Sequence, residues 1–134
     1  MANKENVMEW VQYAETDLTA AEFLHQNIEN INPKPFTIIC YHCEQSAEKM
    51  LKGALAAYDV EIQKTHDLGI LVEELQTFFP IGEAIIDDCY DLIPYGVKVR
   101  YPQELDINGF HVKDALLKAR RIYEFLKKKI EEKF

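Results

Sequence analysis

The sequence YHCEQSAEKMLKGAL, from Tyr41 to Leu55, carries the clearest helical pattern in the chain. Its apolar residues recur at steps of three and four, which is the spacing of one helix face. They are Cys43, Ala47, Met50, Leu51 and Ala54. A second stripe at the same spacing is polar and consists of His42, Gln45, Lys49 and Lys52. A helix of this kind is typical either of a plain helical bundle or of a bundle with a polar groove along one side.

The segments on either side of this stretch predict further helices. Apolar steps of three and four recur in each of them, whereas NINPKP at positions 30–35 and the irregular VKVRYPQELDING at positions 97–109 interrupt the pattern. Asn3 is a candidate N-cap for the first helix, and Asp67 or Thr65 for the third. The predicted helices cover about 4–29, about 36–58, a short one from about 68 to 77, one beginning near Pro80 and ending before Pro94, and one from Asp106 or Asn108 to about 130.

No internal repeat, low-complexity tract or strand-like alternation is visible in the sequence. The pattern therefore predicts an all-α fold, an up-and-down bundle of about five helices with a four-helix core and one short helix. At 134 residues and 48% hydrophobic composition, the chain is expected to form a single domain over residues 1–134, large enough to bury a core without a metal or a disulfide.

Charge and hydropathy narrow the classes of function. The formal net charge is -8, which disfavours general binding to phosphate backbones or to anionic membranes. No apolar run approaches the roughly 20 residues that cross a bilayer, and no signal-peptide pattern is present. We expect a cytoplasmic protein that does not associate with membranes.

Cys40 and Cys43 form a C-x-x-C motif beside His42, so a metal or redox site must be considered. The thioredoxin-type motif opens a helix after a strand, whereas this one lies inside a helical pattern. Structural zinc needs four ligands, and no second pair of ligands with suitable spacing occurs. We predict that these cysteines, with Cys89, are reduced and buried, and that the protein uses no metal or cofactor.

The polar stripe supplies the first candidate site. His42, Gln45 and Lys49 lie within two helical turns and can bind a phosphate or the edge of a base. A histidine satisfied within the bundle or at a dimer contact is an equally open interpretation of His42. Lys49 and Lys52 can hold an anionic ligand, or they can pair with Glu44 or Glu48.

Arg100 supplies the second candidate, because its guanidinium suits a phosphate or a carboxylate and no helical packing explains its place. It can equally clamp an acidic helix. Tyr101 beside it can stack on a base. His66 is better explained as an anchor for its loop. The basic face of the last helix is either a phosphate patch or a solvated helix end; it consists of Lys118, Arg120, Arg121 and Lys127 to Lys129.

Three spaced motifs together resemble a known family. They are YHCEQSAEKMLKG from Tyr41 to Gly53, KTHDL from Lys64 to Leu68 and VRYP from Val99 to Pro102, preceded by a helix with Trp10 and the AETDL stretch from Ala14 to Leu18. In this order they resemble the HEPN domain, the higher eukaryotes and prokaryotes nucleotide-binding domain. The resemblance implies an all-α bundle that is commonly a homodimer. It also implies a possible partner, a minimal nucleotidyltransferase. Some HEPN proteins act as the toxin or the antitoxin in a pair with such an enzyme.

Many HEPN proteins are metal-independent ribonucleases with an Arg-x(4 to 6)-His motif. Here Tyr101 and Pro102 follow Arg100, and the next histidine, His111, lies beyond that spacing. The sequence instead resembles the Arg-Tyr-Pro branch, for which binding of a nucleotide or a nucleotidyltransferase is the usual suggestion. The alternative is a ribonuclease that cuts RNA across a homodimer, with Arg100 and His42 or His111. Whether the protein is an enzyme stays open at this point.

Overall fold

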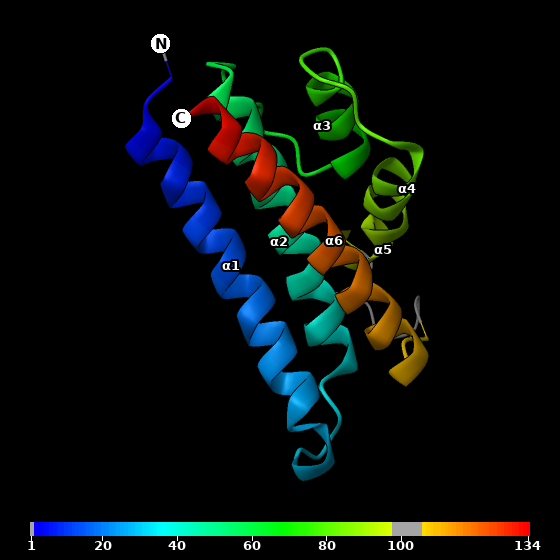
Figure 1. Cartoon of the computed structure of the whole chain (residues 1–134). Helices are drawn as coiled ribbons and strands as arrows, with labels where there is room; N and C mark the ends of the chain where they lie inside the picture. Colours follow the sequence, from blue (N-terminus) through cyan, green and yellow to red (C-terminus); the bar gives the residue numbers. More distant parts are fainter. Residues whose placement is uncertain (1, 98–105) are drawn as a thin grey trace.

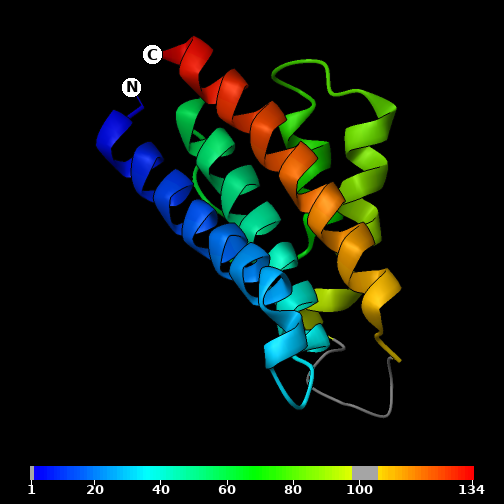
Figure 2. The same cartoon turned by 60° about the horizontal axis from the view of Figure 1, so that its bottom comes forward.

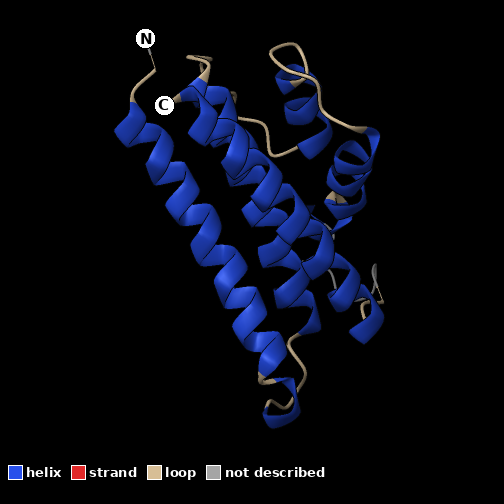
Figure 3. Cartoon of the chain, viewed as in Figure 1, coloured by secondary structure: helices blue, strands red, loops and turns tan. Residues whose placement is uncertain are grey.

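The computed structural model describes residues 2–97 and 106–134, and all regular structure within those ranges is helical (Figure 3). The elements are α1 (Lys4–Gln26), a 3-10 turn (Ile28–Asn30), α2 (Phe36–Ala57), α3 (Leu68–Leu75), α4 (Glu83–Leu92), the single turn α5 (Pro94–Val97) and α6 (Gly109–Lys133). The prediction of an all-α fold is confirmed. Arg100 and Tyr101 lie outside the described residues.

Three long helices, α1, α2 and α6, form the body of the molecule. The chain descends along α1 and ascends along α2 and α6, so the N- and C-termini lie at the same end (Figure 1). The short helices α3, α4 and α5 lie on the side away from α1 (Figures 1 and 2). Because α2 packs against α1, α3, α4, α5 and α6, it is the central helix, and its polar residues meet several other elements.

Side chains that satisfy free backbone groups set the helix ends. Asn3 accepts a hydrogen bond from the N–H of Asn6, and Asp67 accepts from the first turn of α3, as predicted. Asn108 and His111 form a capping box at the start of α6. The prediction that the fourth helix begins near Pro80 is wrong by three residues, because the chain runs on past Ile81, which packs into the core, to Gly82 in an extended conformation.

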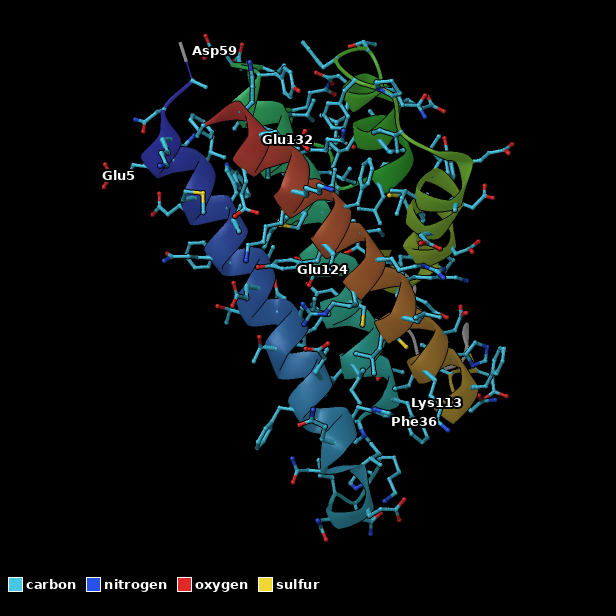
Figure 4. The ribbon with its side chains drawn as sticks, in the orientation of Figure 1. Glu5, Phe36, Asp59, Lys113, Glu124 and Glu132 are labelled. Atoms are coloured by element: carbon cyan, nitrogen blue, oxygen red, sulfur yellow. The ribbon has the colours of Figure 1, made fainter. Side chains whose placement is uncertain are left out.

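The end of α2 directs the loop that follows. Asp59 has a φ of 60°, and the N–H groups of Asp59 and Val60 bond to the carbonyls of Ala56 and Leu55. This is the Schellman arrangement, which ends a helix and reverses the chain. Asp59 lies at the same end of the molecule as Glu5 of α1 and Glu132 of α6 (Figure 4). The reversal starts the loop that carries Thr65 and His66 back along α2.

Cys40, Cys43 and Cys89 are all buried and free of disulfides, so the prediction that they are core residues is confirmed. Burial raises the pKa of the Cys40 and Cys89 thiols to about 12 and that of Cys43 above its ordinary value. These side chains are therefore neutral thiols at physiological pH and pack as small apolar groups. Among the described helices, none has the length and apolar character needed to cross a bilayer.

Candidate functional site

Two polar side chains of α2 point at α1 and meet Asp17 there. His42 Nδ1 lies 2.8 Å from Asp17 Oδ1, and Lys49 Nζ lies 2.5 Å from Asp17 Oδ2. We call Asp17, His42 and Lys49 the Asp17 cluster. Because a carboxylate only accepts, His42 Nδ1 carries the proton of this hydrogen bond. Both oxygens of Asp17 are thus paired, and the imidazole is fixed in orientation.

The Asp17 cluster forms because α1 and α2 pack antiparallel in one fixed register. The buried Ser46 hydroxyl donates to the carbonyl oxygen of Ala14 at 2.8 Å, which ties the two backbones together near their middle. Asp17 lies one turn further along α1, beside the apolar residues Ala14 and Leu18. This register brings Asp17 between two residues of α2 that are seven positions apart.

A second group of polar side chains joins α2 to the loop before α3. Glu48 Oε2 accepts from Lys52 Nζ at 3.0 Å and from His66 Nδ1 at 2.9 Å. Within the described residues, the buried Glu48 Oε1 has no hydrogen-bond partner. We call Glu48, Lys52 and His66 the Glu48 cluster. It fastens the loop after α2 to the helix, which confirms the interpretation of His66 as an anchor, although the His66 side chain is 74% exposed.

A cleft of about 370 Å³ opens beside the Glu48 cluster, between α2, the loop before α3 and the α5 turn. We call it the α2–α5 cleft; it is lined by Tyr41, Glu44, Gln45, Thr65, His66, Asp67, Ile93 and Gly96. Gln45 Nε2 donates to Glu44 Oε1 at 2.8 Å. A Cβ atom at Gly96 would lie 2.6 Å from Glu44 Oε2. The α5 turn can therefore close over Glu44 only because position 96 has no side chain.

Glu44 is the most perturbed carboxyl of the cleft. The residue is 2% exposed, and burial is the main reason why its pKa rises from 4.5 to about 8. The nearby charge of Glu48 raises the pKa further, while the hydrogen bond from Gln45 and the charge of Lys52 lower it. Glu44 is consequently mainly protonated at neutral pH. A neutral carboxyl can donate one hydrogen bond and accept others.

The predicted site residues do not all meet in one place. His42 and Lys49 belong to the Asp17 cluster, and Gln45 lines the α2–α5 cleft. Of the predicted lysine pairs, Lys52 does pair with Glu48, whereas Lys49 pairs with Asp17.

Sequence reasoning missed Asp17, and it considered Glu44 and Glu48 only as partners for the lysines of α2 and not as buried carboxyl groups. Each is buried beside an apolar helical stripe. An acidic residue placed next to core positions is the signal that points to such a group, because a carboxyl group is rarely buried without a partner.

The basic face of α6 is engaged by carboxylates. Arg121 makes two hydrogen bonds to Asp88, of 2.9 and 2.7 Å. Arg120 bonds to Glu22 on α1 and to Glu124 on its own helix, which is labelled in Figure 4. These pairs favour the structural interpretation of the α6 arginines over a phosphate patch.

Comparisons with known proteins identify the family of this helical bundle. The model of the HEPN domain matches residues 7–130. The crystal structure of TT1696 from Thermus thermophilus is similar with a TM-score of 0.79 and 21% identity, over 96% of this chain and 98% of that one. ST0689, an archaeal HEPN homologue, is similar with a TM-score of 0.71 and 21% identity, over 92% and 97% of the two chains. The search of curated proteins finds no match. The HEPN model covers all three long helices and both polar groups of α2, and the chain therefore belongs to the HEPN domain family.

Proposed function

We propose that this HEPN protein binds a nucleotide, with the base in the α2–α5 cleft. The observation that carries the proposal is the composition of that cleft, which combines the ring of Tyr41 with hydrogen-bonding groups of Glu44, Gln45 and Thr65. Its volume of about 370 Å³ lies within the range of small-molecule sites. An aromatic face beside a few directed polar groups is how proteins hold an unstacked base.

The charge balance supports a single nucleotide over a long nucleic acid. The net charge of -8 repels an extended phosphate backbone, whereas one nucleotide needs only a few local donors. His66 is largely exposed at the cleft, and His42 contacts the ring of Tyr41 at a centroid distance of 5.6 Å. We propose that the phosphate lies at the mouth of the cleft, within reach of His66.

Arg100 and Tyr101 enter the proposal from the sequence alone. They follow Gly96, which lines the cleft, by four and five residues. A guanidinium is well matched to phosphate, and a tyrosine ring stacks on a base. We expect Arg100→Ala to weaken nucleotide binding if this assignment is right.

Calorimetric titration with AMP and GMP tests the proposal directly. Gln45→Ala removes an amide from the cleft and is expected to weaken binding by about tenfold, the effect of losing roughly 1.4 kcal/mol. The matched control is Gln76→Ala, which changes an exposed glutamine at the end of α3. No binding of either nucleotide by the wild-type protein would overturn the proposal.

A second proposal concerns partners. Tyr13 and Phe23 on the outer face of α1 are 60% and 61% exposed, and they belong to a shallow groove along that helix. Exposed aromatic rings on one helix face favour protein contact. We propose that this face joins two copies of the chain. Trp10, on the same helix, packs partly against the core.

The partner proposal has two tests. Phe23→Ser should shift a dimer of wild-type protein to monomer in light scattering after size exclusion, and a wild-type monomer would contradict it.

Binding of a minimal nucleotidyltransferase, and a toxin–antitoxin pairing with it, remain proposals that the family resemblance supports. A pull-down with such an enzyme tests them.

The ribonuclease alternative has less support. His111 Nδ1 accepts a hydrogen bond from the N–H of Asn108, so one ring nitrogen is engaged in capping α6. The Arg-x(4 to 6)-His spacing is also missing from the sequence. Cleavage of RNA by the wild-type protein that is lost in Arg100→Ala would revive this alternative.

A further inference from the structure

Glu44 presents a carboxyl oxygen to the α2–α5 cleft. Its Oε1 already accepts from Gln45, whereas Oε2 lies beside Gly96 and has no hydrogen-bond partner within the described part of the chain. Both Glu44 and Gly96 line the cleft. We propose that Glu44 in its protonated form selects an adenine nucleotide, by donating to the adenine ring nitrogen N1 and accepting from the exocyclic amine. This inference rests on the proposed nucleotide-binding function and names its ligand class.

The hydrogen-bond pattern explains the choice of base. The Watson–Crick edge of adenine offers an acceptor, N1, beside the donor N6–H₂, which complements the O–H and C=O of a neutral carboxyl. An ionised carboxylate has no donor for N1, so its pairing with adenine is lost. Guanine instead carries two adjacent donors, N1–H and N2–H₂, which suit a carboxylate. Cytosine shares the adenine pattern but has a smaller ring to stack on Tyr41.

The groups around Glu44 keep the proton on it. Glu48 lies one turn further along α2, and its buried Oε1 has no hydrogen-bond partner among the described residues. Together with burial and the charge of Asp17 on α1, Glu48 opposes ionisation. Lys52 favours ionisation, but its ammonium is already bonded to Glu48. These effects raise the pKa of Glu44 to about 8.

Two other titratable groups of the cleft, Asp67 and His66, already make hydrogen bonds. Asp67 Oδ1 accepts from the N–H groups of Gly69 and Ile70 at the start of α3. His66 Nδ1 is bonded to Glu48. From α5, the residue that faces Glu44 is Gly96, which has no side chain. Asp67 Oδ2 also lacks a hydrogen-bond partner among the described residues, but Asp67 is exposed to solvent. Glu44 is thus the buried carboxyl of the cleft with an oxygen left for a ligand.

The test compares AMP and GMP by calorimetry at pH 6.5 and pH 8.5. Since the protonated fraction of a group with a pKa of about 8 falls about fourfold between these values, the affinity for AMP should fall by about fourfold. The affinity for GMP should fall less than that for AMP, or rise. A histidine beside the phosphate would weaken both nucleotides alike, so the ratio of the two affinities isolates Glu44.

Glu44→Gln supplies the second arm. The amide is neutral at both pH values and keeps a donor and an acceptor, so the ratio of AMP to GMP affinity should become independent of pH. Glu29→Gln, at an exposed position at the far end of α1, is the matched control and should behave as wild type.

Four outcomes are distinguishable. A wild-type affinity ratio that does not change with pH, or an equal change of that ratio in Glu44→Gln, overturns the inference and leaves nucleotide binding intact. No binding of either nucleotide by wild type overturns the proposed function itself. If Glu44→Gln fails to fold, the wild-type comparison of AMP with GMP still decides. The inference is supported if the affinity of wild type for AMP falls between pH 6.5 and pH 8.5 by more than its affinity for GMP, and if Glu44→Gln does not show this difference.

Discussion

The Asp17 cluster and the carboxyl groups around the Glu48 cluster combine the same residue types, but their carboxyl groups are neutralised in different ways. In the Asp17 cluster one carboxylate meets two basic side chains, His42 and Lys49, and both of its oxygens are paired. In and beside the Glu48 cluster, two carboxyl groups, Glu44 and Glu48, share one buried lysine, Lys52. One oxygen of Glu48 lacks a hydrogen-bond partner among the described residues, and Glu44 holds a proton near neutrality.

The difference shows two ways of tolerating a carboxyl inside a helical bundle. Where enough cations are within reach, a carboxylate stays charged and is neutralised by pairing. Where burial is deeper and carboxyls outnumber cations, one of them is neutralised by a proton. The second solution leaves a group that both donates and accepts, which is useful for recognition but dependent on pH.

The largest expected effect comes from removing the buried cation. Lys52→Met leaves Glu48 without its lysine in a site where the two side chains are 7% and 6% exposed. We expect a loss of about 3–5 kcal/mol in the free energy of unfolding, measured by urea denaturation. Lys49→Met is the matched control, because the Lys49 side chain is 27% exposed, and it should cost about 1 kcal/mol. Equal losses of stability in Lys52→Met and Lys49→Met would remove the distinction between the Glu48 cluster and the Asp17 cluster.

The pH dependence of stability is the next effect in size. In the unfolded chain Glu44 ionises near 4.5, whereas in the folded protein its pKa is about 8. The folded state therefore binds more protons between these values, and its stability falls as the pH rises from about 4.5 to about 8. Glu44→Gln should remove a slope of roughly 1 kcal/mol per pH unit, about 3 kcal/mol between pH 5 and pH 8.

Melting temperatures of wild type and Glu44→Gln at pH 5, 6, 7 and 8 measure this slope. Asp17→Asn provides the contrast. It should keep most of the slope that Glu44 causes between pH 5 and 8, because the charge of Asp17 is the smallest of the causes that raise the pKa of Glu44. Parallel curves for wild type and Glu44→Gln would show that Glu44 does not hold the proton.

Closing the cleft by a single methyl group has a smaller effect. In Gly96→Ala the new Cβ would lie 2.6 Å from Glu44 Oε2, so α5 or Glu44 must shift. Overpacking of this kind costs about 1–3 kcal/mol, and we also expect loss of nucleotide binding. Gly82→Ala is the control, since a Cβ atom at that position would have no neighbour within 4 Å. Unchanged binding by Gly96→Ala would argue against the cleft as the site.

The smallest expected effect is that of Asp17→Asn. The amide still accepts a hydrogen bond from His42 but loses the ion pair with the partly exposed Lys49, so we expect a cost of about 1 kcal/mol. The loss should shrink in 1 M NaCl, because salt screens exposed charges. A loss as large as that of Lys52→Met would show that the Asp17 cluster is as tightly buried as the Glu48 cluster.

Most of the fold was predictable because helix signals are local. The apolar steps gave α1, α2 and α6 within a few residues, and Asn3 was predicted as a cap. The structure selects Asp67 over Thr65 as the cap of α3, and Asn108 over Asp106 as the residue after which α6 starts. The start of α4 was misplaced because Pro80 suits a first turn, whereas the packing of Ile81 keeps the chain extended to Gly82.

The candidate site was predictable only in part. The donors of α2 were visible as a stripe, and Glu48 was a candidate partner for its lysines, but Asp17 was not foreseen. Arg100 and Tyr101 remain predictions outside the described residues. Lys49 and Asp17 are 32 positions apart in sequence, so their contact depends on how α1 and α2 are aligned.

The sequence by itself determined which faces of the helices are apolar, where the helices are capped, and that the three cysteines belong to the core, because each of these depends on neighbours within about one turn. The tertiary structure decided which carboxyl meets which cation and which one keeps a proton. Those outcomes depend on burial and on the register between helices, as the meeting of Gly96 with Glu44 illustrates. Glu44 and Glu48, one turn apart on α2, thus differ in their hydrogen-bond partners and in which carboxyl oxygen lacks a partner among the described residues.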